Sequence, residues 1–241
     1  MAYTIFCDEG VTFTAAELLN VHFAQVKDRR FLEAMERRGG DLYVITMSPA
    51  FSDSYQAACE ARDTLLSGGR DQNIFVLDTR TAFSGELAVA RRLHDFLLSG
   101  MEPEQTLMET QAFIESLSTI GVLDRADVRR ECKAVSRKGT ALCAGFGRRL
   151  LMEGGQDGRF HVRGRSRHSD TEELAAMAQR QFARRKEKPK RCVITYSGCP
   201  ERAKELGQRL KRACGFRELV IVPADRAASK FMGTGTLMAA F

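Results

Sequence analysis

The sequence predicts an α/β fold built around a parallel sheet. Two continuous apolar runs, at residues 42–47 and 74–77, are typical of strands that are buried on both faces. Longer stretches with helical periodicity alternate with these runs, and strands that alternate with helices indicate β-α-β units.

Strands and helices are expected in turn along the first half of the chain. The first strand is residues 3–6, and the next helix starts at Thr12 or Thr14, because either hydroxyl can cap a helix. Paired glycines, at 39–40 and 68–69, end the two helices that follow. The helices expected here are residues 14–19, 30–38, 54–66, 85–98 and 104–116.

The second half is less regular. Residues 159–163 alternate like a half-exposed strand, and a basic helix at 171–188 ends before Pro189. Strands buried on both faces give way to alternating ones near residues 112–120, so a division into two domains, residues 1–115 and 116–241, is plausible, and one large domain is also allowed. The other elements expected are an apolar run at 121–123, helices at 128–137 and 200–213, and strands at 192–196 and 219–223.

Composition excludes several classes of protein. The 241 residues are 44% hydrophobic and 28% charged, which is too apolar for a disordered chain. No apolar run reaches the ~18–20 residues that span a bilayer, and the opening MAYTIFCDEG lacks the features of a secretory signal. Seven cysteines without a CxxC spacing are expected to be free thiols in a reducing cytoplasm, and no metal site is expected.

Three hydroxyl side chains, Ser48, Ser52 and Ser54, lie between a buried strand and a helix. A helix N-terminus offers free N–H groups and the positive end of a dipole, so this turn can receive a carboxylate or a phosphate. Capping of the helix by Ser52 or Ser54, without a ligand, explains the same residues. Gly233 begins a Gly-Thr-Gly-Thr stretch that can approach a ligand closely or form an ordinary turn.

Positive charge is in slight excess, with a net charge of +6. Basic residues gather at 159–167 and 184–191, but aromatic residues are not interleaved with them and no nucleic-acid-binding motif is present. Nucleic acid is therefore not expected as a partner. A solvated face, or a docking surface for an acidic protein partner, explains these basic residues better.

Residues 47–57, MSPAFSDSYQA, resemble the Ser-Ser-x-x-Ser-Gly-Thr-Tyr-x-x-Ala signature of the DegV family of bacterial fatty-acid-binding proteins. The resemblance covers nearly the whole chain. It implies an N-terminal three-layer α/β/α parallel sheet, a C-terminal two-layer α/β mixed sheet, and a ligand cleft between these domains. The other segments that are similar, in the order of the family, are residues 3–18, 23–31, 75–86, 100–104, 158–167, 195–203 and 232–241.

The resemblance also implies a function. Members bury the chain of one long-chain fatty acid, at about 0.8 kcal/mol per CH₂, and present its carboxylate to a separate ATP-dependent fatty acid kinase. The protein would then be a cytoplasmic carrier and not an enzyme, with no cofactor besides the bound fatty acid. Its basic surface would contact the kinase or an anionic membrane. The residues implied at the ligand are Ser48, Ser52, Ser54, Phe23, Gln25, Phe231 and Gly233.

Several residues of the family pattern are replaced. Phe23 stands where the family has the threonine that helps to bind the carboxylate, and only Gln25 of that motif is kept. Phe231 replaces a histidine, and a strand and a helix that are usual near residues 20–22 are missing. Asp53 adds a negative charge, which next to a bound carboxylate costs free energy or raises a pKa.

Two alternatives therefore stay open. The first is a divergent interaction or regulatory module that has lost lipid binding. The second is an α/β enzyme that acts on a small anionic substrate at the turn formed by residues 48–54.

Overall fold

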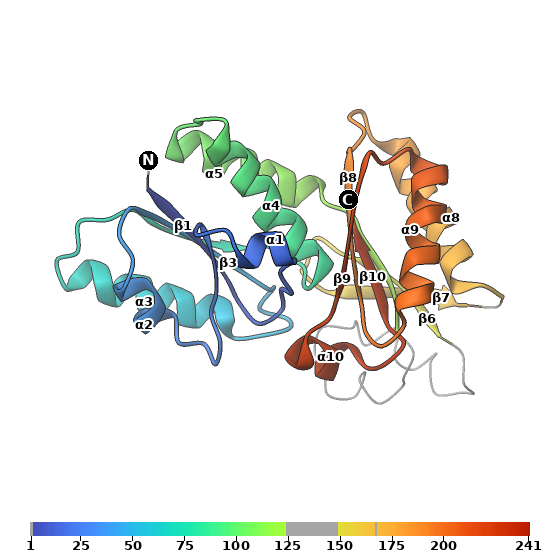
Figure 1. Cartoon of the computed structure of the whole chain (residues 1–241), viewed down its shortest axis with the longest axis horizontal. Coiled ribbons are helices and arrows are strands. Elements are labelled where there is room, and N and C mark those ends of the chain that lie inside the picture. Colours follow the sequence, from blue (N-terminus) through green and yellow to red (C-terminus); the bar gives the residue numbers. More distant parts are fainter. Residues whose placement is uncertain (1, 124–148, 167) are drawn as a thin grey trace.

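The computed structural model describes residues 2–123, 149–166 and 168–241. Its first sheet, sheet A, has four parallel strands in the order β2-β1-β3-β4 (Figure 1). The predicted parallel sheet is therefore confirmed. Its strands are β1 (Tyr3–Cys7), β2 (Phe23–Gln25), β3 (Asp41–Thr46) and β4 (Ile74–Asp78).

Helices cover both faces of sheet A. Alternate residues of a strand point to opposite faces. Phe6 and Val44 accordingly pack toward α2 and α3, whereas Ile5 and Ile45 pack toward α4 and α5. This is the three-layer α/β/α arrangement that the sequence implies. The helices are α1 (Ala15–Leu18), α2 (Phe31–Glu36), α3 (Ser54–Ser67), α4 (Ser84–Leu98) and α5 (Pro103–Ser116).

The second sheet, sheet B, is mixed. Its order is β7-β6-β5-β10-β8-β9, in which β8 and β9 are parallel and the other neighbouring pairs are antiparallel. α8 (Asp170–Arg184) and α9 (Pro200–Cys214) cover one face, and the short α10 (Arg226–Met232) follows β9 (Figure 1). The strands are β5 (Thr119–Leu123), β6 (Leu150–Gly154), β7 (Phe160–Arg165), β8 (Arg191–Tyr196), β9 (Glu218–Pro223) and β10 (Leu237–Ala240).

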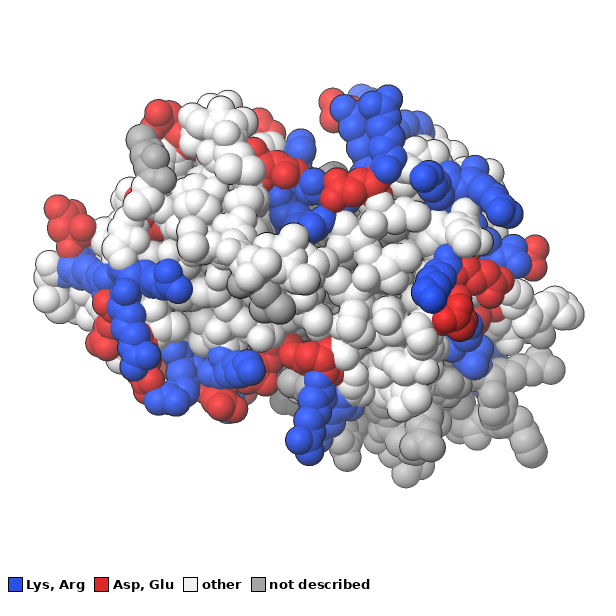
Figure 2. Space-filling model, in the orientation of Figure 1, with Lys and Arg blue, Asp and Glu red and all other residues white. Residues whose placement is uncertain are grey.

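The surface carries charges of both signs, which are interspersed over the face seen in Figure 2. In the part of the chain that the structure describes, no helix is long and apolar enough to cross a bilayer. The described cysteines with free thiols are Cys7, Cys59, Cys192, Cys199 and Cys214.

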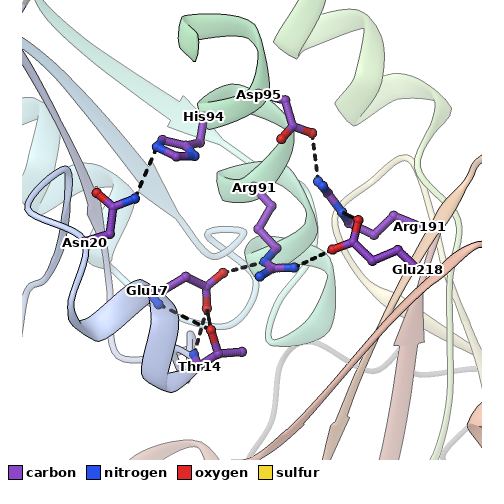
Figure 3. Close-up of polar contacts among 8 residues, drawn as sticks. All are labelled: Thr14, Glu17, Asn20, Arg91, His94, Asp95, Arg191 and Glu218. Atoms are coloured by element: carbon purple, nitrogen blue, oxygen red, sulfur yellow. Dashed lines mark hydrogen bonds and ion pairs between the residues drawn. The ribbon is translucent and has the colours of Figure 1, made fainter.

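Helix α4 joins the two sheets. It packs on β1 and β3 of sheet A and on β8 and β10 of sheet B. Ion pairs extend this join (Figure 3): Arg91 of α4 binds Glu17 of α1 and Glu218 of β9. Arg191 of β8 binds the same Glu218 and also Asp95 of α4. The two halves thus share a core helix, and the division between residues 115 and 116 stays a prediction.

Several short elements differ from the sequence-based expectation. The sequence analysis does not predict β2, β6, α10 or β10. The small residues of β10 form a strand because they pair with both β5 and β8 inside sheet B. The helix expected at 171–188 ends at Arg184, where Arg185 becomes extended. The helix expected at 128–137 lies outside the described residues.

Candidate functional site

The carboxyl ends of the parallel strands of sheet A lie at one edge of the sheet. Ligands of open α/β sheets bind at this edge. Asp8 follows β1, and Gln25 ends β2, where it is level with Cys7. Ser48 and Arg80 each lie two residues after β3 and β4. The edge therefore gathers polar side chains from four separate segments.

The three predicted hydroxyls share the loop between β3 and α3. Ser52 Oγ lies 2.7 Å from Ser54 Oγ and accepts the backbone N–H of Ser54 at 3.1 Å. Ser48 Oγ accepts the N–H of Ala50 at 3.2 Å. Ser48 and Ser54 are buried, whereas Ser52 is half-buried. Ser52 thus binds the first N–H of α3, although Asp53 is the N-cap residue and its side chain makes no capping hydrogen bond. Ser52 is also the hydroxyl most open to a ligand.

Two buried carboxyl groups lie beside this loop. Asp8 accepts the backbone N–H groups of Gly10, at 2.8 Å, and Met47, at 3.0 Å. The carboxyl of Glu86 is fully buried and faces that of Asp8, and neither of its oxygens has a donor of ordinary hydrogen-bond geometry.

Burial, and then the charge of Asp8, raises the pKa of Glu86 well above its usual value. Burial also raises the pKa of Asp8, although its two N–H donors oppose that rise. Because carboxyls in contact share a proton rather than both ionise, we assign the proton to Glu86 and the charge to Asp8.

The hairpin between β6 and β7 covers the loop. Gly158 has a φ of 72°, and a methyl group added there would collide with Ser48 Oγ. The same position lies against the backbone of Arg80. Arg80 and Phe83 have φ values of 52° and 56°, which side-chain-bearing residues rarely adopt. Sheet B therefore closes on two loops of sheet A, and part of the backbone strain of the described residues lies at that contact, while Asp28 and Arg29 hold similar φ values in the loop before α2.

An apolar cluster, here called the junction cluster, continues from the loop into sheet B. Phe51 of the loop meets Phe83 and Phe160 edge-on, with ring centroids 6.2 and 5.2 Å apart. Methionine side chains are unbranched and repack readily, and this cluster holds several of them. A polar loop thus adjoins an adaptable apolar region, as an amphiphilic ligand requires. The buried members are Met47, Ala82, Phe83, Leu123, Met152, Phe160, Ala228, Met232 and Met238.

Two of the predicted residues are held by other contacts. Gln25 Nε2 donates to the carbonyl of Val11 at 2.7 Å. The ring of Phe23 packs on His94 and Phe13, with centroids 4.9 and 5.5 Å apart. Phe23 therefore belongs to the packing between sheet A and α4.

Asp53, which departs from the family pattern, and the predicted residues Phe231 and Gly233 lie nearer the surface. The side chain of Asp53 is 82% exposed and pairs with Arg29 at 3.4 Å, so its charge faces solvent. Phe231 of α10 is 45% exposed, and Gly233, with a φ of 74°, ends that helix. Both flank Met232, which belongs to the junction cluster.

The sequence analysis did not assign a role to Glu86, Arg80 or Gly158. A signal for Glu86 exists, because it is the only charged residue in the apolar run 82–90. Arg80 and Gly158 carry no such signal, since their contact joins segments that are far apart in the chain. Within the described residues, no group of His, Cys, Asp and Glu side chains is arranged to hold a metal ion.

Comparison with known proteins identifies relatives along the whole chain. The sequence model of the DegV family, described as uncharacterised proteins, matches residues 19–241. The DegV domain-containing protein YteA of Lactococcus lactis is 25% identical over 228 residues, which cover 90% of this chain and 76% of that protein.

Two solved structures have the same fold. A DegV family protein from Ruminococcus gnavus, refined with vaccenic acid, superposes with a TM-score of 0.88 and 18% identity over 99% of each chain. The fatty acid kinase (Fak) B3 protein of Streptococcus pneumoniae, loaded with linoleic acid, superposes with a TM-score of 0.84 and 16% identity, covering 100% of this chain and 99% of that one. These superpositions confirm the predicted fold class.

Proposed function

Because the chain belongs to the DegV family, we propose that it binds one long-chain fatty acid and presents the carboxylate to a separate ATP-dependent fatty acid kinase. One observation carries the proposal: the loop with three hydroxyls adjoins the junction cluster, and Met47 and Phe51 belong to both. The relatives from R. gnavus and S. pneumoniae hold vaccenic and linoleic acid, respectively.

Ser52 is the main ligand of the carboxylate in this proposal. Its hydroxyl is the most open of the three, and the N-terminus of α3 directs partial positive charge toward it. Arg80, on the facing loop, adds a cation, whose charge also acts on the carboxylate of Asp78 at the end of β4. Because Glu86 keeps its proton, Asp8 is the buried anion beside this loop that opposes the ligand.

The acyl chain enters the junction cluster in this proposal. Each CH₂ that leaves water contributes about 0.8 kcal/mol. The four methionines of the cluster, together with the aromatic rings around Phe51, can move to admit a chain without breaking a hydrogen bond. A head group at Ser52 would place the first carbons of the chain beside Met47 and Phe51.

Catalysis takes place on the kinase in this proposal, and the present chain is its binding subunit. The basic segment at residues 184–191 supplies the charge for an acidic kinase surface, with an anionic membrane as a further contact. The free thiols of the described cysteines fit a reducing bacterial cytoplasm.

Mass spectrometry of purified protein tests lipid binding. We expect a fatty acid at near-stoichiometric level after expression in bacteria. Ser52→Ala removes a hydrogen bond to a charged group and should weaken oleate binding by roughly 10- to 100-fold. Ser67→Ala, at the exposed far end of α3, makes the same chemical change and should leave binding unaltered. Equal affinities in the two variants would show that the head group binds elsewhere.

One observation favours a second candidate, a module that has lost lipid binding. The carboxylate of Asp8 contacts the Ser54 hydroxyl and repels an incoming carboxylate. If this candidate is correct, purified protein contains no fatty acid, and added oleate does not raise its melting temperature.

A further inference from the structure

A cavity of about 700 Å³ opens between the two halves. None of residues 47–54, here called the serine loop, lines it. Its volume is within the range of sites that hold drug-sized ligands. The cavity lies between α4, the end of α5 and the segment that joins α8 to β8. Along α4 the lining runs from Ala88, two residues after Glu86, to Asp95, which is nine residues after Glu86 or roughly 14 Å at the rise of an α-helix.

The lining of the cavity is strongly cationic. Six basic side chains face three acidic ones, and Figure 2 shows basic groups on both sides of the notch between the halves. Arg191 binds both Asp95 and Glu218, at 2.8 and 2.7 Å (Figure 3), and Glu218 is also bound by Arg91, which does not line the cavity. An excess of positive charge therefore remains in the cavity.

Arg185 is a partly buried cation of the cavity. The residue is half-buried, and one terminal nitrogen of its guanidinium donates to Ser118 Oγ at 2.8 Å and to backbone oxygens of Ser116 and Phe241. Burial lowers the pKa of Arg185. These bonds use a single nitrogen, so the other N–H groups of the guanidinium can donate to an anion in the cavity.

Three further cations of the cavity, Arg92, Lys186 and Lys190, have no ion-pair partner in the described residues. Lys188 is different, because its ammonium group donates to the carbonyls of Phe182, Ala183 and Arg185 at the end of α8. The free cations exceed what a single monoanion can balance. Several phosphate groups on one molecule would balance them.

We propose that this cavity binds an organic polyphosphate of the size of a nucleoside di- or triphosphate. Arg185, Lys186 and Lys190 bind the phosphate oxygens, for which a guanidinium offers paired donors. Phe113 and Val193 form an apolar wall for the rest of the molecule.

Isothermal titration calorimetry with ATP and with tripolyphosphate, at about 150 mM salt so that weak surface attraction is screened, tests the proposal. We expect saturable binding at one site. Lys186→Gln combined with Lys190→Gln should weaken it by about tenfold or more. Lys204→Gln combined with Lys211→Gln removes the same charge from the exposed face of α9, outside the cavity, and should change the affinity by less than about threefold.

The two probes separate the contributions of phosphate and of the apolar wall. Equal affinities assign the site to the polyphosphate group alone, and tighter binding of ATP assigns a role to Phe113 and Val193. Absence of saturable binding to the unmodified chain would overturn the proposal. Equal losses in the two lysine pairs would overturn it as well, because they would indicate attraction by net charge only.

The cavity and the proposed lipid site can be tested apart. The variant at Lys186 and Lys190 should keep its bound fatty acid, and Ser52→Ala should keep its affinity for ATP. A chain that carries lipid but does not bind ATP contradicts the polyphosphate site alone. A chain that binds ATP but carries no lipid contradicts the fatty-acid proposal alone.

Discussion

Replacement of Glu86 by glutamine tests the buried acid pair directly. The substitution keeps the volume of the side chain and replaces a carboxyl that has no donor by an amide that can donate to Asp8. If Glu86 is protonated in the folded protein, the unmodified chain loses more stability than the variant as the pH rises.

The sign follows from proton linkage. The folded pKa of Glu86 lies above its ordinary value of 4.5, so the folded state holds a proton that the unfolded chain releases. Between pH 4.5 and the folded pKa, each pH unit therefore lowers the free energy of unfolding by about 1.4 kcal/mol. This slope corresponds to roughly 3 to 6 °C in Tm per pH unit for a chain of this size.

Urea denaturation followed by circular dichroism, from about pH 5 to about pH 8, measures this difference. Glu86→Gln should become more stable than the unmodified chain as the pH rises. Glu36→Gln, an exposed position on α2, controls for the loss of one negative charge and should follow the unmodified chain. Parallel curves for the Glu86 variant and the unmodified chain would refute the reasoning, because they would show that the folded state holds no extra proton.

Two further predictions concern the contact between the halves. Arg91→Ala leaves the buried Glu17 without its cation and should lower the free energy of unfolding by about 2 kcal/mol, less than for a fully buried pair because Thr14 still binds Glu17. Arg29→Ala breaks the exposed pair with Asp53 and should cost less than about 0.5 kcal/mol. Gly158→Ala should cost more than the ~1 kcal/mol of a positive φ alone, since its methyl group collides with Ser48. Gly69→Ala has the same sign of φ with open space around it, and equal urea midpoints for these two variants would contradict the contact.

Much of the fold could be predicted because its strands are apolar on both faces. The runs at residues 42–47 and 74–77 match β3 and β4 within one residue at each end. Local pattern could not predict β10, whose strand character depends on β5 and β8 on either side. Pairing between distant segments overrides the weak propensity of small residues.

The candidate site was predictable only in part. Ser48, Ser52 and Ser54 are neighbours in the chain, and the structure brings them together as expected. The orientation of Asp53 was not predictable, because the direction of a side chain at a helix start depends on the fold around it. Its carboxylate turns to solvent beside Arg29, so the replacement in the family signature adds no charge to the buried part of the loop.

Glu86 shows why sequence patterns fail at this site in particular. An amphipathic helix has one apolar face, and the pattern of residues 85–98 predicts a helix of that kind. The first turns of α4 are instead buried on every side, because sheet A packs on one side and sheet B on the other. A carboxyl that periodicity would assign to solvent therefore lies in the core. It is tolerated there because Glu86 stays protonated beside Asp8. Burial raises its pKa, so its charge depends on pH. Glu86 lies beside the serine loop. Because the packing of both sheets against α4 keeps this carboxyl neutral, that packing decides how much negative charge an anionic ligand faces at the loop.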